Sequence, residues 1–388
     1  MTTKEENKKS AWTDFSSGCL QLKSRPFRAS IEITRNCDLK CTMCSHSWEP
    51  QYARHRPEYD MTPALFRKIA NEFFPYLEQA HLQGFGESVI SPHWPEILKI
   101  CRPYSRDIRF TIVTNLNKKD DGMWKELVDM GFQISFSCDG ATPETFEAIR
   151  RGSRFERILS NLEVVRKARA SFKGPEFCFL VTLQSGNYRE MPLFIDLAAH
   201  YGAEKVVFSN IQGDPGRSLS RLFWPVKRAV RAFCGKGPVE NLCIYNVPRR
   251  ELSELRTETL RRAVSHGVSV SFIDNFVERT EEKPGPEDRS PAELPADYIE
   301  GIGSIGHVAR YKKCFKPFSY VVINYKGDIG PCNHLLADGV WEQMGNIRDN
   351  GLMDIWNSAR YRQFRGTHLC ASPAGSACKW CYNHRITE

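Results

Sequence analysis

The stretch Cys37-Asp-Leu-Lys-Cys41-Thr-Met-Cys44 decides what fold and chemistry this chain is expected to have. It directly follows a short alternating strand that opens at Ile31 and ends near Thr34. Three thiolates on a short loop can ligate three irons of a [4Fe–4S] cube and leave the fourth iron open to an exogenous ligand. The alternative is a zinc site in which His46 supplies the fourth ligand. The spacing and the position after the first strand favour the cluster.

The composition limits the classes of protein to which the chain can belong. It has 388 residues, 41% of them hydrophobic, and 14 cysteines. The first residues are charged, and no apolar run is long enough for a membrane helix. We therefore expect a cytoplasmic protein without a membrane partner, in a compartment where thiols act as metal ligands rather than as disulfides. The net charge of +8 is mild, and we expect no nucleic-acid partner.

Beyond the cysteine loop, strand-like and helix-like segments alternate. Strands are expected near 79–84, 108–114, 133–138, 176–183 and 205–210, and helices near 62–76, 94–103, 121–130, 154–170 and 189–202. A repeated strand–helix unit predicts a parallel sheet with helices on its outer face. The fold class is therefore α/β, with a partial (β/α)6 barrel. In such barrels the chemistry lies at the carboxyl ends of the strands.

The pattern divides the chain into four parts. We expect a loose polar lead-in over 1–27, the barrel core over 28–278, an acidic proline-rich linker over 279–304 and a compact cysteine-bearing α+β module over 305–388. Within the core, a helix at about 249–265 leads to a final apolar strand, 268–273.

The C-x-x-x-C-x-x-C loop after the first barrel strand resembles that of the radical S-adenosylmethionine (SAM) enzymes. The resemblance implies that Cys37, Cys41 and Cys44 hold a [4Fe–4S] cluster and that Met43 packs on the adenine of SAM. The resemblance also implies reductive cleavage of SAM. The cluster donates one electron, methionine leaves, and a 5′-deoxyadenosyl radical takes a hydrogen atom from the substrate. A flavodoxin or ferredoxin is the electron donor expected from the family.

Further matches stand at the ends of later strands. The segment Gly84-Phe85-Gly86-Glu87 is similar to the family's Gly-Gly-Glu region, which contacts the SAM amino group, although Ser88 replaces a common proline. The resemblance assigns the other SAM contacts to Thr114, Asn115, Ser135, Ser137 and Asp139 near the ribose, Arg150 at the SAM carboxylate and Ile211 at the adenine. For Arg150 the alternative is a solvated helix position.

The second group of cysteines resembles an auxiliary-cluster module, either SPASM or its shorter form, twitch. A full SPASM module holds two clusters and needs seven or eight cysteines, whereas this region has five, counting Cys370, which favours twitch. The resemblance implies that one auxiliary [4Fe–4S] cluster is held by four thiolates, those of Cys314, Cys332, Cys378 and Cys381. The spacing is especially similar to that of the 2-deoxy-scyllo-inosamine dehydrogenases, radical SAM enzymes that oxidise an alcohol. A four-cysteine zinc ribbon is the alternative, although only one C-x-x-C pair is present.

Several reactive residues have no assigned place. Cys370 and Cys138 are candidate catalytic residues as hydrogen-atom donors, and packing is the alternative for both. Asp139 and Asp328 are candidate bases, in turns where Asp also serves the backbone. Arginines that recur at near-helical spacing favour a solvated helix face over an anion site; these are Arg217, Arg221, Arg228 and Arg231.

Three functions follow from these patterns. The first is oxidation of a small polar substrate, a carbohydrate-like or cyclitol alcohol, with the auxiliary cluster as electron acceptor. The second is crosslinking, epimerisation or oxidation of a peptide residue. Peptide-modifying relatives often carry an N-terminal peptide-binding domain, and the 36 residues before Cys37 are too few for one, which favours the alcohol. The third is a non-enzymatic zinc or electron-transfer protein, which leaves the SAM-pocket matches without a purpose.

Overall fold

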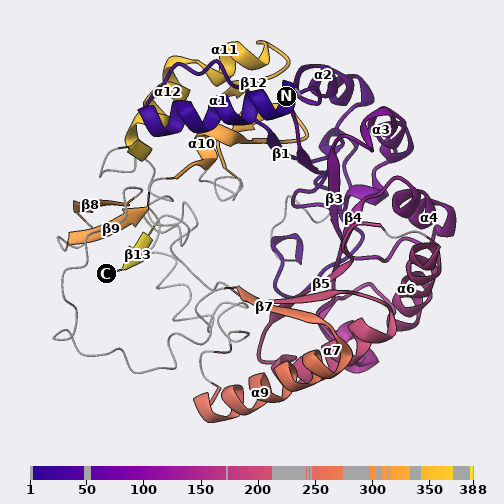
Figure 1. Cartoon of the computed structure of the whole chain (residues 1–388). Coiled ribbons are helices and arrows are strands. Elements are labelled where there is room, and N and C mark those ends of the chain that lie inside the picture. The colour runs from indigo at the N-terminus through magenta and orange to yellow at the C-terminus, as the bar shows by residue number, and fades with distance from the viewer. Residues whose placement is uncertain are drawn as a thin grey trace, which may run out of the picture.

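The computed structural model describes residues 3–47, 54–171, 174–211, 242, 244, 247–273, 298–302, 308–312, 314–332, 342–369 and 385–387. One large sheet dominates it, with the strand order β12-β11-β10-β1-β2-β3-β4-β5-β6-β7 (Figure 1). From β10 to β7 every neighbouring pair of strands is parallel. The expected α/β fold with a parallel barrel sheet is confirmed.

The barrel strands and helices alternate along the chain. The strands are β1 (Arg28–Ile31), β2 (Gln79–His81), β3 (Arg109–Thr114), β4 (Gln133–Ser137), β5 (Cys178–Leu183), β6 (Lys205–Asn210) and β7 (Ser269–Ile273). The helices are α2 (Pro63–Phe73), α3 (Trp94–Cys101), α4 (Asp121–Asp129), α5 (Pro143–Ile149), α6 (Phe155–Ala170), α7 (Met191–His200) and α9 (Arg249–His266). They lie outside the curved sheet (Figure 1). The short α5 is the one helix of this set that the sequence pattern did not predict.

The cysteine-bearing module is not a separate sheet. It contains α10 (Lys316–Ser319), β10 (Tyr320–Ile323), β11 (Asp328–Gly330), β12 (Gly345–Asn346), α11 (Leu352–Trp356) and α12 (Ala359–Leu369). Strand β10 pairs in parallel with β1, so that Arg28 lies opposite Tyr320 and Ile31 opposite Ile323. The barrel sheet therefore continues into the module.

A second, antiparallel sheet consists of β8 (Tyr298–Ile302), β9 (Val308–Lys312) and β13 (Arg385–Thr387). Strand β8 lies where the sequence predicted the end of a linker. That part of the prediction is wrong, because residues 298–302 pair with β9 in an antiparallel ladder.

The expectation of a loose N-terminal lead-in is also wrong. Helix α1 (Thr3–Ser17) packs beside the module. The Asn7 side chain closes a pair of hydrogen bonds with the backbone of Arg25, at 2.9 and 2.7 Å. The Trp12 ring stacks on Phe315 with 4.0 Å between centroids. Tertiary contacts of a few apolar side chains hold this polar helix, so its sequence carries almost no periodic signal.

The two faces of the barrel sheet differ in chemistry. Side chains on the outer face are apolar and buried against the helices, as for Ala29, Ile31, Ile112, Phe136 and Val181. Side chains on the inner face are mostly polar, and solvent reaches many of them, including His81, Ser135, Ser137, Thr182 and Ser209. Strand periodicity of two produces this alternation. Because small polar groups line it, the barrel interior (here the lumen) is suited to a polar ligand.

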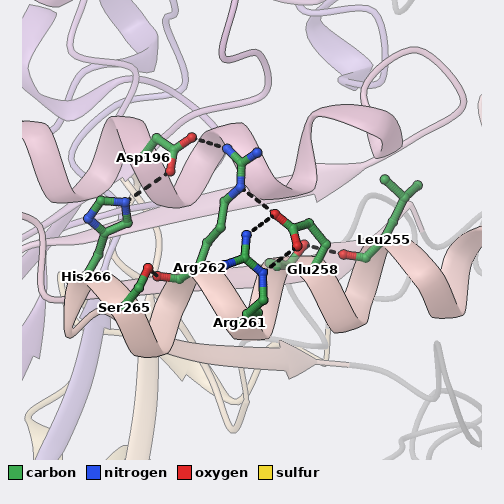
Figure 2. Close-up of polar contacts among 8 residues, drawn as sticks. Asp196, Leu255, Glu258, Arg261, Arg262, Ser265 and His266 are labelled. Carbon is green, nitrogen blue, oxygen red and sulfur yellow. Dashed lines mark hydrogen bonds and ion pairs between the residues drawn. The ribbon is translucent and has the colours of Figure 1, made fainter.

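Helices α7 and α9 are joined at the surface by an ion-pair network (Figure 2). Arg262 of α9 pairs with Asp196 of α7 and also donates from Nε to Glu258, at 2.8 Å. His266 Nε2 lies 3.2 Å from the same Asp196 carboxylate. These groups are at least partly exposed, so we expect the network to contribute little to stability.

In the part of the chain that the structure describes, no helix combines the length and the apolar character required to cross a membrane.

Candidate cofactor and substrate site

The cysteine loop lies at the carboxyl end of β1 and is fixed by the segment that follows α5. Lys40 N donates to the carbonyl of Arg151 at 2.9 Å, and Thr42 N donates to that of Ile149 at 3.0 Å. Cys41 is buried within this pairing. Cys37, Cys44 and the predicted adenine contact Met43 are half-buried.

Asp38, inside the cysteine motif, fastens the loop to the end of β3. Its two carboxylate oxygens accept hydrogen bonds from the side-chain amides of Asn115 and Asn117, at 2.8 and 2.7 Å. The amide nitrogen of Asn115 also lies 4.0 Å from Cys37 Sγ. Asn117 in turn accepts a hydrogen bond from Ser153 at 2.9 Å. The sequence pattern did not single out Asp38, Asn117 or Ser153. Asp38 lies inside the cysteine motif and Asn117 lies two residues after Asn115, so these two side chains were candidates for local hydrogen bonds.

The two glycines of the Gly84–Glu87 segment are required by contacts within the protein. A Cβ on Gly86 would lie 2.4 Å from the Asn36 carbonyl oxygen, and one on Gly84 would lie 2.2 Å from Glu32 Cγ. The segment therefore packs directly against the chain that leads into the cysteine loop. The close approach of these two loops is what excludes a side chain at both positions.

Glu87 is brought together with the end of β3, as the sequence predicted. Its carboxylate accepts hydrogen bonds from the Thr114 hydroxyl at 2.8 Å and from Asn115 N at 2.7 Å. Burial raises the pKa of Glu87 to about 7. Val89 N also donates to this carboxylate, and a carboxylate has about four lone-pair sites, so one remains for another donor such as an ammonium group.

Arg150 and Asp139 form a largely buried ion pair. The guanidinium donates from Nε and Nη2 to Asp139 Oδ2, at 2.7 and 2.6 Å, and Asp139 Oδ1 accepts from Thr182 N at 2.8 Å. Arg150 also hydrogen-bonds the Cys41 sulfur. Arg150 is thus not a solvated helix residue. In this arrangement it links β4 and β5 to the cysteine loop, and the Asp139 carboxylate is engaged by Arg150 and Thr182.

The cysteine thiols lie in surroundings that oppose ionisation. Burial raises the pKa of Cys41 to about 11, against the favourable effect of Arg150. Burial also raises the pKa of Cys37 above its ordinary range. Metal ligands must be thiolates, so the positive charge of bound iron has to compensate for this desolvation. The donor set fits an iron–sulfur cluster with three protein ligands.

Replacing Asp139 by Asn should lower the free energy of unfolding by about 3 kcal/mol or more, because Arg150 would keep its buried charge without a counter-ion. Urea unfolding, monitored by circular dichroism, measures this change. The matched control is Glu258→Gln in the exposed network of Figure 2, which should change stability little. Equal effects of the two variants would contradict a structural role for the Asp139–Arg150 pair.

The other predicted residues of the core fall in different places. Ser135 and Ser137 are on the inner face of β4, where Ser135 Oγ lies 3.0 Å from Cys178 Sγ. Ile211 is buried just beyond β6, and its N donates to the carbonyl of Leu183 at 3.3 Å. Cys138 is on the outer face, fully buried in the hydrophobic core. Its position favours packing over hydrogen-atom donation.

Asp328, the other candidate base, closes a hairpin. Its carboxylate accepts hydrogen bonds from Asn324 at 2.9 Å, Gln343 at 2.7 Å and Asn346 at 2.8 Å. Several predicted residues lie outside the described residues: Cys370, Cys378, Cys381, Arg217, Arg221, Arg228 and Arg231.

Cys314 and Cys332 lie at the opposite end of the barrel from the first cysteine loop. Cys314 immediately precedes Phe315 and α10, which leads into the start of β10. Strand β11 is antiparallel to β10, with Gly330 opposite Val322, so Cys332 follows it near the same start of β10. Since β10 is parallel to β1, both cysteines lie at the amino ends of the barrel strands.

Two buried donors near Cys332 have no hydrogen-bond partner among the described residues. They are the hydroxyl of Tyr361 and Nη2 of Arg365. The Cys332 thiol acts electrostatically on Tyr361, and Cys332 packs against the core to which Tyr361 belongs. The Arg365 guanidinium stacks 4.4 Å from the Tyr361 ring centroid. Unpartnered buried donors beside a thiol suit a group rich in sulfur acceptors, so these residues fit an auxiliary iron–sulfur cluster.

Among the described residues, no three His, Cys, Asp or Glu side chains converge as the ligands of a single metal ion do. A cubane cluster needs a wider spacing, since each thiolate binds a separate iron.

Two family models match the chain. Residues 31–191 match the radical SAM superfamily, and residues 314–382 match the SPASM iron–sulfur cluster-binding domain. Among curated proteins, the tungsten-containing aldehyde ferredoxin oxidoreductase cofactor-modifying protein of Pyrococcus furiosus is 22% identical over 353 residues, which are 86% of this chain and 82% of that protein.

Solved structures share the fold. SuiB of Streptococcus suis bound to S-adenosylmethionine has a TM-score of 0.61 at 15% identity, and the match covers 98% of this chain and 75% of SuiB. The protein anSMEcpe, with bound AdoMet and Cp18Cys peptide, has a TM-score of 0.56 at 16% identity, with 92% of this chain and 86% of anSMEcpe covered. The cofactors are SAM, the [4Fe–4S] cluster of the radical SAM domain and auxiliary iron–sulfur binding in the SPASM domain. The chain is therefore a radical SAM enzyme with a C-terminal SPASM domain.

Proposed function

We propose that this enzyme oxidises a substrate held in the lumen, between a SAM site at the carboxyl ends of the strands and an auxiliary cluster at their amino ends. The observation that carries the proposal is the placement of the two cysteine groups at opposite ends of one polar lumen. An electron acceptor on the far side of the substrate suits a net oxidation.

In this proposal Cys37, Cys41 and Cys44 hold the SAM cluster, and Cys314 and Cys332 hold the auxiliary cluster together with Cys378 and Cys381. Glu87, Thr114 and Asn115 form the part of the SAM pocket that receives the amino group. Ser135, Ser137, Met43 and Ile211 complete the SAM pocket. Arg150 and Asp139 act instead as positioning residues, because their charges are already paired beneath Cys41.

When bound, the cluster and SAM supply one electron and a 5′-deoxyadenosyl radical. For a substrate alcohol, oxidation to a carbonyl removes two electrons. One would leave with the hydrogen atom, which forms 5′-deoxyadenosine, and a cluster held by Cys314, Cys332, Cys378 and Cys381 would supply the acceptor for the other. The hydroxyl proton goes to a base or to solvent. The chain itself would orient the substrate with polar groups of the lumen.

The first candidate substrate is a carbohydrate-like or cyclitol alcohol. Support comes from the inner face of the barrel, where the hydroxyls of Thr182 and Ser209 are partly accessible hydrogen-bonding groups. The second candidate is a peptide, for radical crosslinking, epimerisation or oxidation of a residue. Its support is that the similar anSMEcpe structure contains a peptide, and that SuiB has also been solved bound to its precursor peptide SuiA.

We also propose a flavodoxin or ferredoxin as reductant.

The functional division of the chain is a core over 28–278 and a cluster module over 305–388, joined by the continuous sheet rather than by the linker alone.

The test is a screen of sugar alcohols, cyclitols and peptides with anaerobically reconstituted enzyme, SAM and reduced flavodoxin. Substrates carry deuterium at the carbons to be oxidised. The proposal predicts one deuterium in 5′-deoxyadenosine and a product that has lost two hydrogens, in equal amounts. A product that has exchanged one deuterium for one hydrogen, or one that gains deuterium from D2O when the substrate is unlabelled, would show a redox-neutral reaction and contradict the proposal.

A further inference from the structure

The end of the lumen at the amino ends of β1 to β3 carries two arginines, Arg28 and Arg109, that form no ion pair with a carboxylate of the described residues. In the strand register, Arg28 on β1 lies opposite Gln79 on β2, and Gln79 lies opposite Arg109 on β3. Partners across a parallel sheet point to the same face. Arg28 and Arg109 therefore share one row with Gln79 on the inner face, and His81 lies in the next row above them.

The surroundings of His81 are positive. Its ring Nδ1 hydrogen-bonds the Thr111 hydroxyl, and the side chain is half-buried. Burial, followed by the charges of Arg28, Arg109 and Lys316, lowers the pKa of His81 to about 4. The imidazole is thus neutral at physiological pH, and every charged group that acts on it is a cation.

The two arginines of this row are incompletely paired. Arg28 Nη2 donates to Ser319 Oγ at 3.3 Å, whereas its buried Nε has no hydrogen-bond partner in the described chain. Neither Arg28 nor Arg109 forms an ion pair with a described carboxylate. Glu176, which precedes β5 on the inner side of the sheet, forms an ion pair with neither arginine. Its carboxylate accepts a hydrogen bond from the Gln133 side chain at 3.3 Å. Arg109 is exposed, whereas Arg28 is half-buried, and a half-buried cation without a counter-charge is costly unless a ligand supplies one.

We propose that Arg28, Arg109 and His81 form a subsite for an oxyanion group of the substrate, either a carboxylate or a phosphate. The two guanidinium groups provide charge-assisted donors, and the neutral imidazole provides one further hydrogen bond through Nε2. This inference deepens the proposed function, because it places an anionic end of the substrate in the same lumen.

The subsite also constrains the size of the substrate. From Arg28 to Glu32, at the carboxyl end of β1, the chain rises four residues, or about 13 Å at the usual strand rise. The anionic group would therefore lie on the order of 10 Å from the carbon that loses its hydrogen. An extended substrate with a carboxylate or phosphate at one end fits better than a neutral monosaccharide.

The test measures binding rather than turnover. Methyl phosphate and acetate are titrated into the reconstituted enzyme with SAM, at constant ionic strength, by isothermal calorimetry. We expect millimolar binding of at least one of them, weakened about 10-fold or more in Arg28→Gln/Arg109→Gln. Tighter binding of methyl phosphate assigns a phosphate, and tighter binding of acetate assigns a carboxylate.

Two further variants make the result decisive. Arg109→Gln alone changes an exposed residue at the start of β3, so it should fold normally and still weaken binding. Arg261→Gln, on the outer helix α9 in Figure 2, removes the same charge away from the lumen and should bind like the wild type. Undiminished binding in the double variant, or no binding of either probe at 50 mM (about 50-fold above the expected dissociation constant), would overturn the subsite. SAM cleavage is assayed separately, so its failure would count against the proposed function instead.

Discussion

Cys41→Ser should abolish reductive cleavage of SAM, lowering 5′-deoxyadenosine formation by roughly 1000-fold or more. A serine hydroxyl is a poor iron ligand, and only three protein thiolates are available for this cluster. Cys41 is also the most deeply placed of the three, under Arg150 and within the backbone pairing of Lys40 and Thr42. The measurements are iron and sulfide content after anaerobic reconstitution, and 5′-deoxyadenosine by liquid chromatography.

The matched control for this variant is Cys19→Ser. Cys19 is half-exposed beyond α1, and its thiol donates to the carbonyl of Gln21 at 3.2 Å, a bond that a hydroxyl can replace. It should retain full iron content and activity. If Cys41→Ser cleaved SAM at the rate of Cys19→Ser, the assignment of the cysteine loop would be wrong.

Cys332→Ser should separate SAM cleavage from product formation. We expect 5′-deoxyadenosine formation within about 3-fold of wild type in the absence of substrate, because the cysteine loop lies at the other end of the barrel. We expect oxidised product to fall by about 100-fold or more, since the second electron would have no acceptor. The variant should also lose the iron and sulfide of one cluster, which chemical analysis detects.

Cys101→Ala is the control for this second experiment. Cys101 is buried in the core at the end of α3, so its loss removes a thiol and a little packing but no proposed ligand. It should retain both clusters and the coupling of cleavage to oxidation. Full product formation by Cys332→Ser would exclude an electron-accepting role for the auxiliary cluster.

The strand–helix alternation was predictable because each barrel element is defined by local sequence. Helix α2 begins as predicted, with the Thr62 hydroxyl accepting from Leu65 N at 3.3 Å and Pro63 at its first position. The apolar strands are equally local signals. Two features depended on distant partners instead. Helix α1 is held by Phe315, and β10 finds β1 nearly 300 residues earlier in the chain.

The candidate site was predictable to a similar degree. Glu87, Thr114 and Asn115 meet as expected, because successive strand ends converge at one edge of a parallel sheet. The Arg150–Asp139 pair was not foreseen, although both residues had been singled out. A sequence shows which groups stand at strand ends, but not which of them neutralise one another. For the same reason Cys138 could not be placed on the outer face before the strand register was known.

The central claim is that two clusters lie at opposite ends of one lumen. Anomalous diffraction at the iron edge, from crystals of the anaerobically reconstituted enzyme with SAM, tests it most directly. The account predicts one iron peak beside Cys37, Cys41 and Cys44, at the carboxyl end of β1, and another beside Cys314 and Cys332, at the start of β10. Iron only at the first position, or both peaks at the same end of the barrel strands, would contradict it.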